Sequence, residues 1–301
     1  MNDFVDIHAD DYAYTIETSK DIIDCIKNES LDSFSIICNT SYFDESMEML
    51  YKEIPSFSYL PLMSIHLNLP EGLFIGEILP LSWAQLFLSS FKINNKNIKN
   101  SLKKEIKYQL DKAQKCIEKC ISIAKENNVG CFQKGMRIDS HVHTHMIPIV
   151  WNSLVEVIEE NDYQIEYIRN SKEPIMPFIS NGIFDITNTM KNRILMLFSG
   201  KADDFCKKND LPQSYLWGLE MSGHMDYDRI RKVYPDMFKL ASAKNRRLEI
   251  LFHPGRAAKE EYRKELNADY FNDFNSSKNR EIEKDAVMRI KEIITQEFYG
   301  K

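Results

Sequence analysis

The segment Asp139-Ser140-His141-Val142-His143-Thr144-His145 places three histidines within five residues. The whole chain has seven histidines, so this spacing calls for an explanation. On an extended backbone the side chains at 141, 143 and 145 would point to one side, where imidazole nitrogens can bind a divalent metal ion. The segment therefore indicates a metal site. A zinc site built from these three histidines alone is one alternative, and a chance cluster on a solvated loop is another.

Two adjacent carboxylates, Asp10 and Asp11, follow the apolar run Phe4–His8. Such neighbours are not both stable as anions unless one meets a cation or holds a proton. An exposed helix cap would also explain the pair.

His66 and His253 each end an apolar, strand-like run in the same way. In a barrel of parallel strands the carboxyl ends form one rim, which would bring Asp11, His66, His141 and His253 together. One aspartate and two histidines would leave coordination positions open for water and a substrate carbonyl. A spare aspartate would accept a proton and a remaining histidine would return one. This chemistry is metal-assisted hydrolysis of an amide or ester.

The elements that must position these residues alternate along the chain. Strand-sized runs fall at Phe4–His8, Ser33–Cys38, Leu60–Leu67, Met136–Asp139, Gln164–Arg169, Tyr215–Glu220 and Leu248–Phe252. Amphipathic helical patterns fall at Thr15–Lys27, Asp44–Lys52, Asn100–Asn127, Ile149–Glu160, Asp226–Ala243 and Asn279–Gln296. The polar stretch Asn94–Asn100 is predicted to be an exposed loop. The alternation predicts an α/β protein with a parallel sheet or barrel of about seven βα units.

Composition excludes several classes of protein. The 45 acidic residues outnumber the 39 basic ones, so no general field for binding phosphates is expected, and nucleic acid is not a predicted partner. The six cysteines form no CxxC pair, which favours reduced thiols in a cytoplasmic protein. No apolar run reaches the length of a membrane span and the first residues do not resemble a signal peptide, so no membrane association is expected.

The motifs together resemble those of the YdjC-like carbohydrate deacetylases, a family that includes chitooligosaccharide deacetylases. They are similar in sequence and in order to the family signatures. The matching segments are His8-Ala9-Asp10-Asp11-Tyr12, His66-Leu67-Asn68-Leu69 with Glu71-Gly72, Asp139-Ser140-His141-Val142-His143 and His253-Pro254-Gly255.

The resemblance implies a distorted, TIM-like (β/α) barrel of about seven strands and a role for each matched residue. Asp11, His66 and His141 would hold a divalent metal of the magnesium type. Asp10 would be the catalytic base, and His253 would act as an acid or oxyanion stabiliser near the substrate. By donor chemistry alone, Mg²⁺, Mn²⁺, Zn²⁺, Co²⁺ and Ni²⁺ all remain open.

The chain also departs from the family pattern. Tyr12-Ala13 stands where the family has Phe-Gly, so the turn lacks a glycine suited to positive φ. The resemblance implies that His143 and His145 orient other groups, contact substrate or pack.

Two further residues are candidates for substrate binding on their own positions. Arg169 ends the apolar run after Gln164 and could orient a substrate hydroxyl or an acetate, or could lie on the surface as a salt-bridged side chain. His224 lies in Met221–Asp226 and could line the pocket, unless that segment is simply a helix start capped by Asp226.

We therefore expect residues 1–301 to form one deacetylase domain that removes acetyl groups from N-acetylated sugars, such as diacetylchitobiose. A metal amidohydrolase for another small amide and a non-catalytic metal- or carbohydrate-binding barrel are the alternatives. The rim argument favours one domain because Asp11 and His253 must meet at one site. The apolar stretch Ile78–Phe91 would suit the interface of a homodimer.

Overall fold

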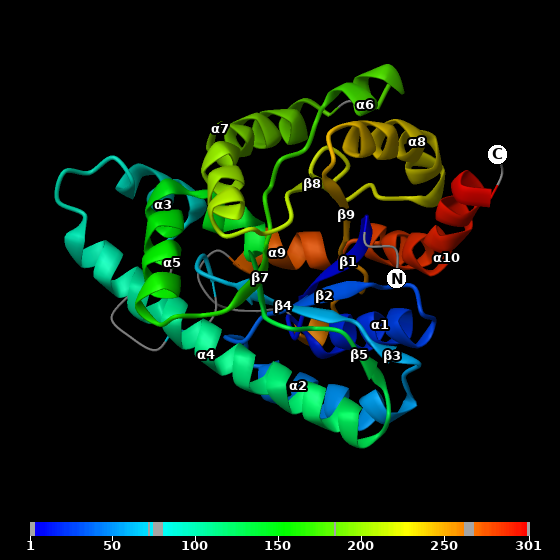
Figure 1. Ribbon diagram of the computed structural model, residues 1–301, viewed down its shortest axis with the longest axis horizontal. Coiled ribbons are helices and arrows are strands. Elements are labelled where there is room, and N and C mark those ends of the chain that lie inside the picture. The colour runs from blue at the N-terminus through cyan, green and yellow to red at the C-terminus, as the bar shows by residue number, and fades with distance from the viewer. Residues whose placement is uncertain (1–3, 72, 75–80, 184, 262–267, 300–301) are drawn as a thin grey trace.

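A computed structural model describes residues 4–71, 73–74, 81–183, 185–261 and 268–299. Seven parallel strands form its main sheet, in the order β7-β6-β4-β2-β1-β9-β8 (Figure 1). They are β1 (Val5–Tyr12), β2 (Ser33–Ile36), β4 (Leu62–Leu67), β6 (Met136–Ser140), β7 (Ile165–Ile168), β8 (Ser214–Trp217) and β9 (Arg247–Phe252). Each falls at one of the seven predicted runs. A separate pair joins β3 (Tyr59–Leu60) to β5 (Gly130–Cys131).

The main sheet curls into a half-barrel, which confirms the predicted distorted (β/α) barrel. Tyr167 of β7 donates a hydrogen bond to Glu249 of β9, although five strand spacings separate these strands in the sheet order. A flat sheet would place them about 24 Å apart at about 4.8 Å per strand. The sheet therefore wraps around the face that carries these two side chains. The gap between the edge strands is bridged after β7, where Lys172 O accepts the Leu216 N–H at 3.0 Å.

The helices cover the outside of this sheet. The six predicted ones are α1 (Ile16–Lys27), α2 (Phe43–Glu53), α4 (Lys96–Glu126), α5 (Pro148–Glu160), α8 (Tyr227–Ala243) and α10 (Asn279–Tyr299). The structure adds α3 (Trp83–Ser89), α6 (Met176–Ser180), α7 (Ile186–Lys208) and α9 (Ala268–Asn275). Short 3₁₀ turns are η1 (Ile54–Ser56), η2 (His141–Met146) and η3 (Lys259–Glu261). Figure 1 shows α4 and α5 side by side along one flank.

The predicted loop Asn94–Asn100 is wrong from Lys96 onward, because α4 begins there. Polar residues continue the helix at this point: Lys99 forms a salt bridge with Glu156 of α5, and Ile98 packs partly against the core. A polar helical turn that rests on a neighbouring helix is not distinguishable from a loop by composition.

Helix α7 was not predicted, because its apolar side chains lie on both its exposed and its buried face. The apolar side chains Ile186, Met190 and Leu197 are exposed, whereas the polar side chains Asn192 and Asp203 are buried. Asn192 donates to Glu220 in the loop after β8, and Asp203 binds two basic side chains. The helix also buries Leu195, Ala202, Phe205 and Cys206. Its buried face therefore mixes polar and apolar side chains and lacks the usual apolar stripe.

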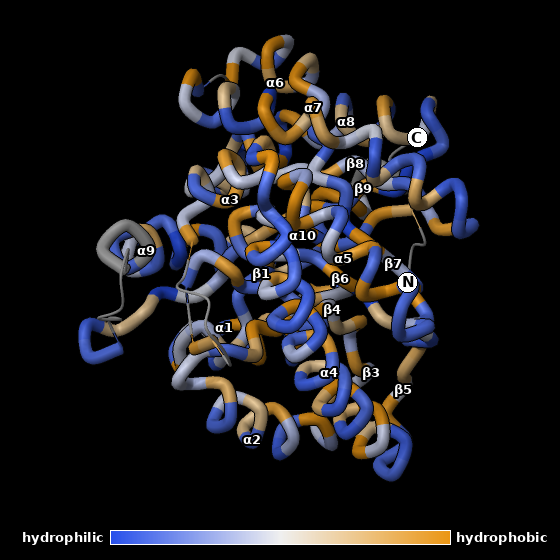
Figure 2. The backbone as a smooth tube through the Cα atoms, turned by 90° about the vertical axis from the view of Figure 1, so that its left-hand side faces the viewer, coloured by the Kyte–Doolittle hydropathy of each residue, from blue (hydrophilic) through white to orange (hydrophobic). Residues whose placement is uncertain are grey.

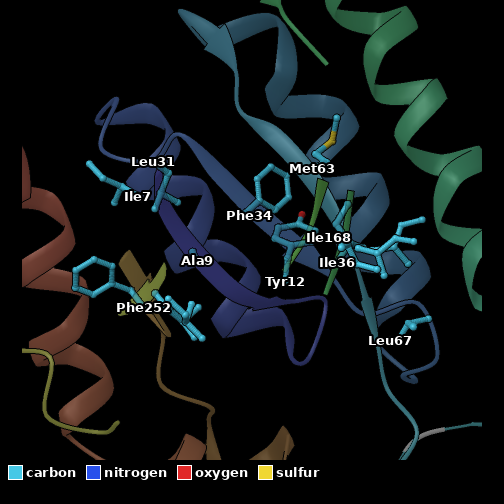
Figure 3. Close-up of a cluster of buried hydrophobic side chains, with 14 of the residues drawn as sticks. Ile7, Ala9, Tyr12, Leu31, Phe34, Ile36, Met63, Leu67, Ile168 and Phe252 are labelled. Atoms are coloured by element: carbon cyan, nitrogen blue, oxygen red, sulfur yellow. The ribbon is translucent and has the colours of Figure 1, made fainter. Parts of the chain in front are cut away.

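The strands alternate between apolar and polar side chains, which point to opposite faces of the sheet. The apolar set packs under the helices, and Figure 3 shows part of it. It includes Ile7, Ala9, Phe34, Ile36, Met63 and Ile168. The polar set fills the inside of the curl, where barrels usually place branched apolar residues. It includes Asp6, His8, Asp10, Ser33, Ser35, Ser64, His66, Arg137, Asp139, Tyr167 and Glu249.

Candidate metal centre and catalytic site

Asp10 and Asp11 lie at the carboxyl end of β1, where the pairing with β2 shifts between Ala9 and Tyr12. Asp11 has φ 71°, in the left-handed region. This irregularity breaks the alternation of the strand, so both carboxylates reach the same side. His66 of β4 accordingly lies close to both, with Nδ1 3.8 Å from Asp10 Oδ1 and Nε2 3.4 Å from Asp11 Oδ1.

The turn that follows keeps a positive φ although it lacks the glycine of the family. Ala13 has φ 68°, a conformation that disfavours any residue with a Cβ. Its N–H donates to Ser19 Oγ at 3.0 Å and its carbonyl accepts from Thr40 Oγ1 at 2.5 Å. These contacts hold the strained backbone in place.

Three predicted metal ligands, Asp11, His66 and His141, meet beside this turn. One ligand atom of each lies within 4.8 Å of the other two, and all three side chains are buried. His141 Nδ1 is 3.0 Å from Asp11 Oδ1. One carboxylate and two imidazoles within this distance can bind a single divalent ion with positions to spare.

Each of the two histidines has a second carboxylate on its other nitrogen. His66 Nδ1 is 2.6 Å from Asp139 Oδ1, and His141 Nε2 is 3.3 Å from Glu71 Oε1. Metal-binding histidines commonly pair in this way with a carboxylate that fixes the ring and its tautomer. Sequence reasoning gave Asp139 and Glu71 no role of their own. The alternation of polar and apolar residues in β6 could have indicated Asp139, which precedes Ser140 and lies on the polar face of that strand.

The electric field at this cluster favours positive charge. Burial lowers the pKa of His66, but Asp10 and Asp139 outweigh it and raise that pKa to about 10. For His141, burial is likewise outweighed by Asp11, and its pKa rises to about 9. Surroundings that favour imidazolium over imidazole also favour a divalent cation held by the neutral rings.

A second buried group, His8, Asp10 and Asp139, also brings its ligand atoms within 4.8 Å of one another. Arg169 already supplies a cation there, with Nη2 2.9 Å from Asp10 Oδ1 and 3.1 Å from Asp139 Oδ2. Repulsion by this guanidinium disfavours a metal ion at this second group, so the Asp11 cluster is the better candidate.

Asp10 is held by polar groups on several strands. Arg169 donates to both of its oxygens and Ser35 Oγ donates to Oδ1 at 2.7 Å. Burial would raise the pKa of Asp10, but Arg169 and His66 hold it well below its usual range. The carboxyl is therefore ionised at neutral pH. His253 faces it from the end of β9, with Nε2 3.9 Å from Asp10 Oδ2.

Three residues were predicted to contact substrate, and the structure places each differently. The Arg169 side chain is fully buried and pairs with Asp10, Asp139 and Glu249. It presents no surface to a ligand, which corrects the prediction that Arg169 contacts the substrate. His143 is partly buried, with Nδ1 3.0 Å from Ser171 Oγ, which leaves ligand contact open. Burial, helped by the Arg169 charge, holds the pKa of His143 well below its usual range, so this ring is neutral.

His224 lies on an exposed turn before α8. Its described contacts are made by its backbone, with Met221 and Arg229, and do not reach the Asp11 cluster. Asp226 accepts the Arg229 N–H and caps α8, in agreement with the alternative prediction of a capped helix start. The structure gives no support to His224 as a pocket residue.

The three-histidine zinc site is wrong. Residues 141–146 form the 3₁₀ turn η2 with positive φ at Val142 and His143, so the side chains diverge. Both ring nitrogens of His145 are engaged, with Ser140 Oγ at 2.5 Å and the Arg169 carbonyl at 2.9 Å. Of the three, only His141 faces Asp11.

Comparisons with known proteins address the family and the fold. A family model described as YdjC-like protein matches residues 5–120 and 136–292. A comparison with curated proteins found no significant match. The crystal structure of an Enterococcus faecalis V583 protein, provisionally assigned cleavage of cellobiose phosphate, is similar in fold. It has a TM-score of 0.57 and 16% identity, over 97% of this chain and 94% of that one. On the family match, which covers most of the sequence, this chain belongs to the YdjC-like family.

Proposed function

We propose that this protein is a metal-dependent deacetylase of N-acetylated sugars, with short chitooligosaccharides such as diacetylchitobiose as substrates. Family membership supports an enzyme that processes carbohydrates. The observation that carries the proposal is the pairing of two functions in one buried cluster. Asp11, His66 and His141 fit a metal ion, and Asp10 and His253 stand beside them as groups that can move protons.

A metal bound by Asp11, His66 and His141 would polarise the amide carbonyl and acidify the attacking water. Asp10, held ionised by Arg169, would accept the proton of that water. His253 lies across from Asp10 and would return a proton to the leaving amine. Water plus amide would thus give acetate and a free amino sugar. Asp10 would gain one proton and His253 would give one up, so the protons balance.

We propose Mg²⁺ as the metal, with Zn²⁺, Mn²⁺, Co²⁺ and Ni²⁺ as alternatives for the same donors. His143 is proposed as a substrate contact because it is neutral and partly accessible beside Arg169. All six cysteines are free, which supports the proposed cytoplasmic location. No helix in the described ranges combines the length and the apolar character needed to cross a bilayer.

Acetate release from diacetylchitobiose is the direct test. Purified protein should release acetate, lose activity in a chelator and recover it when one of the five metals is restored. The Asp10→Asn variant should bind metal like the wild type but release acetate at least about 100-fold more slowly. Undiminished release by this variant would remove Asp10 as the base. Turnover of other small amides but not of acetylated sugars would favour the amidohydrolase alternative, and metal binding without turnover would favour the binding barrel.

We also propose that the protein forms a homodimer. Residues 78–80 of the predicted apolar stretch Ile78–Phe91 lie outside the described residues, but Leu88 and Phe91 are 61% and 67% exposed. Helix α7 adjoins them through the Phe87–Phe198 ring contact at 6.0 Å and exposes Leu197. Figure 2 shows hydrophobic segments at the α6 and α7 end of the molecule. Exposed apolar side chains on adjoining helices favour an interface with another copy of the chain.

Sedimentation velocity of the wild type and of Leu197→Glu tests the dimer. The wild type should sediment as a dimer and the variant as a monomer. Ile282→Glu, which alters an exposed apolar side chain on α10, is the matched control and should remain dimeric.

A further inference from the structure

Helix α10 holds the backbone of His253 on both sides. The His253 N–H donates to Glu283 Oε2 at 2.8 Å, and the His253 carbonyl accepts from Arg280 Nη1 at 3.1 Å. Glu283 and Arg280 are three residues apart on one helical face, and both are only 1% exposed. Two buried side chains of a distant helix thus bind both polar backbone groups of a single residue at the end of β9.

The imidazole ring of His253 is also placed by these elements. Its Nδ1 lies 3.8 Å from Glu283 Oε2, while its Nε2 lies 3.9 Å from Asp10 Oδ2. The ring of Phe274 packs edge-on against it with centroids 5.9 Å apart. Arg280 in turn lies over Phe274, 3.6 Å from the ring centroid. The ring therefore stands between two carboxylates, one facing each nitrogen.

Packing of α10 does not account for the charged pair. The helix already buries a run of apolar side chains against the fold, comprising Ala286, Val287, Ile290 and Ile293. A buried ion pair adds little stability over apolar residues of the same size, because desolvation offsets the attraction. Glu283 and Arg280 thus lie on the turn of α10 that contacts His253, and docking of the helix does not require the electrostatic cost of burying them.

We propose that Glu283, held in place by Arg280, is a positioning residue that fixes His253 with Nδ1 toward α10 and Nε2 toward the reacting groups. A carboxylate beside Nδ1 keeps a proton on that nitrogen, as in other paired histidines. Nε2 is then the atom that exchanges a proton with the substrate. The inference rests on the proposed function, since His253 must take part in proton transfer for the orientation to matter.

Nuclear magnetic resonance of the histidine rings tests the orientation without any substrate. Two-bond ¹H–¹⁵N correlations of protein labelled at histidine report which ring nitrogen carries the proton, and His253→Gln assigns the signals. The wild type should show His253 protonated at Nδ1, and Glu283→Gln should shift it toward a mixture of tautomers. A wild-type His253 with a bare Nδ1, or signals that do not change in Glu283→Gln, would overturn the proposal. Should the variant not fold, the wild-type spectrum alone decides.

Kinetic measurements then test whether the orientation of the His253 ring affects catalysis. In Glu283→Gln the amide oxygen can still accept the His253 N–H, so the loop stays tied while the charge beside Nδ1 is lost. Acetate release from diacetylchitobiose should fall about 10- to 100-fold in kcat with KM nearly unchanged. Metal affinity should not change. Glu281→Gln, an exposed position on the same helix paired with Arg256, should behave like the wild type.

The two measurements separate the proposals. A wild type that releases no acetate contradicts the proposed function, while the ring spectra still decide how His253 is held. A Glu283→Gln enzyme with the kcat of the wild type contradicts the positioning role, even where deacetylation is confirmed.

Discussion

Arg169 donates to both carboxylate oxygens of Asp10, at 2.9 Å each, across 159 residues of sequence. The same guanidinium binds Glu249 of β9 and Asp139 of β6. Its fork-shaped geometry suits such bidentate pairing, which a lysine cannot reproduce. Arg169 therefore sets the charge and the orientation of the proposed base from inside the half-barrel.

Removing this guanidinium should destabilise the fold. In Arg169→Met three buried carboxylates lose their shared cation, so the free energy of unfolding should fall by about 3 kcal/mol or more. Urea denaturation monitored by circular dichroism measures the change. Arg231→Met, at an exposed position on α8, is the control and should lose less than about 0.5 kcal/mol. Equal stability of the two variants would show that the carboxylates find other partners.

His66→Ala should weaken metal binding by more than about 100-fold, because it removes one of three ligands. Calorimetric titration with Mn²⁺ provides the measurement. His145→Ala is the informative comparison, since both nitrogens of that ring are engaged within the protein. It should lower stability but leave the affinity of the folded protein within a few-fold. An affinity lost in His145→Ala and kept in His66→Ala would restore the three-histidine site.

Asp139→Asn should reduce metal affinity about tenfold without abolishing it. The asparagine oxygen can still accept from His66 Nδ1, but the negative charge that strengthens the imidazole as a ligand is gone. The same titration serves here, with exposed Asp228→Asn as the matched control. Unchanged affinity would mean that Asp139 serves only its ion pair with Arg169.

Asp32 gives a pH dependence away from the site. Burial, with Asp6 nearby, raises the pKa of Asp32 to about 6, while its side chain accepts the Ile7 N–H. Because the folded state binds this proton more tightly than the unfolded state, the stability it contributes is complete below about pH 4. That contribution is lost as the pH rises to about 6. Asp32→Asn keeps the acceptor without the charge.

The Asp32→Asn variant should therefore be more stable than the wild type at pH 7.5, by about 1 kcal/mol after allowance for partial exposure. At pH 4 the advantage should vanish. Urea unfolding at the two pH values measures both differences, and a gain that is equal at both would contradict the raised pKa.

The sequence alone predicted the seven strands, six helices and the residues that approach one another at the end of the barrel. This was possible because strand and helix periods are local properties, and because parallel strands must bring their carboxyl ends to one rim. Asp11, His66 and His141 meet as the rim argument required. Local patterns failed where burial was partly polar. Helix α7 buries Asn192 and Asp203 and exposes Ile186, Met190 and Leu197, so no clear period predicted it.

Only the tertiary structure decided what each polar side chain does. The side chains of His141, His143 and His145 diverge because Val142 and His143 have positive φ. Neither valine nor histidine is a residue type from which positive φ would be predicted. Arg169 looked like a surface or substrate-binding residue, because nothing near it in sequence reveals the three carboxylates that surround it. Glu283, thirty residues beyond His253, carries no motif at all. Local chemistry marks which residues can react, but their partners come from distant strands and helices, and those contacts exist only once the sheet has curled.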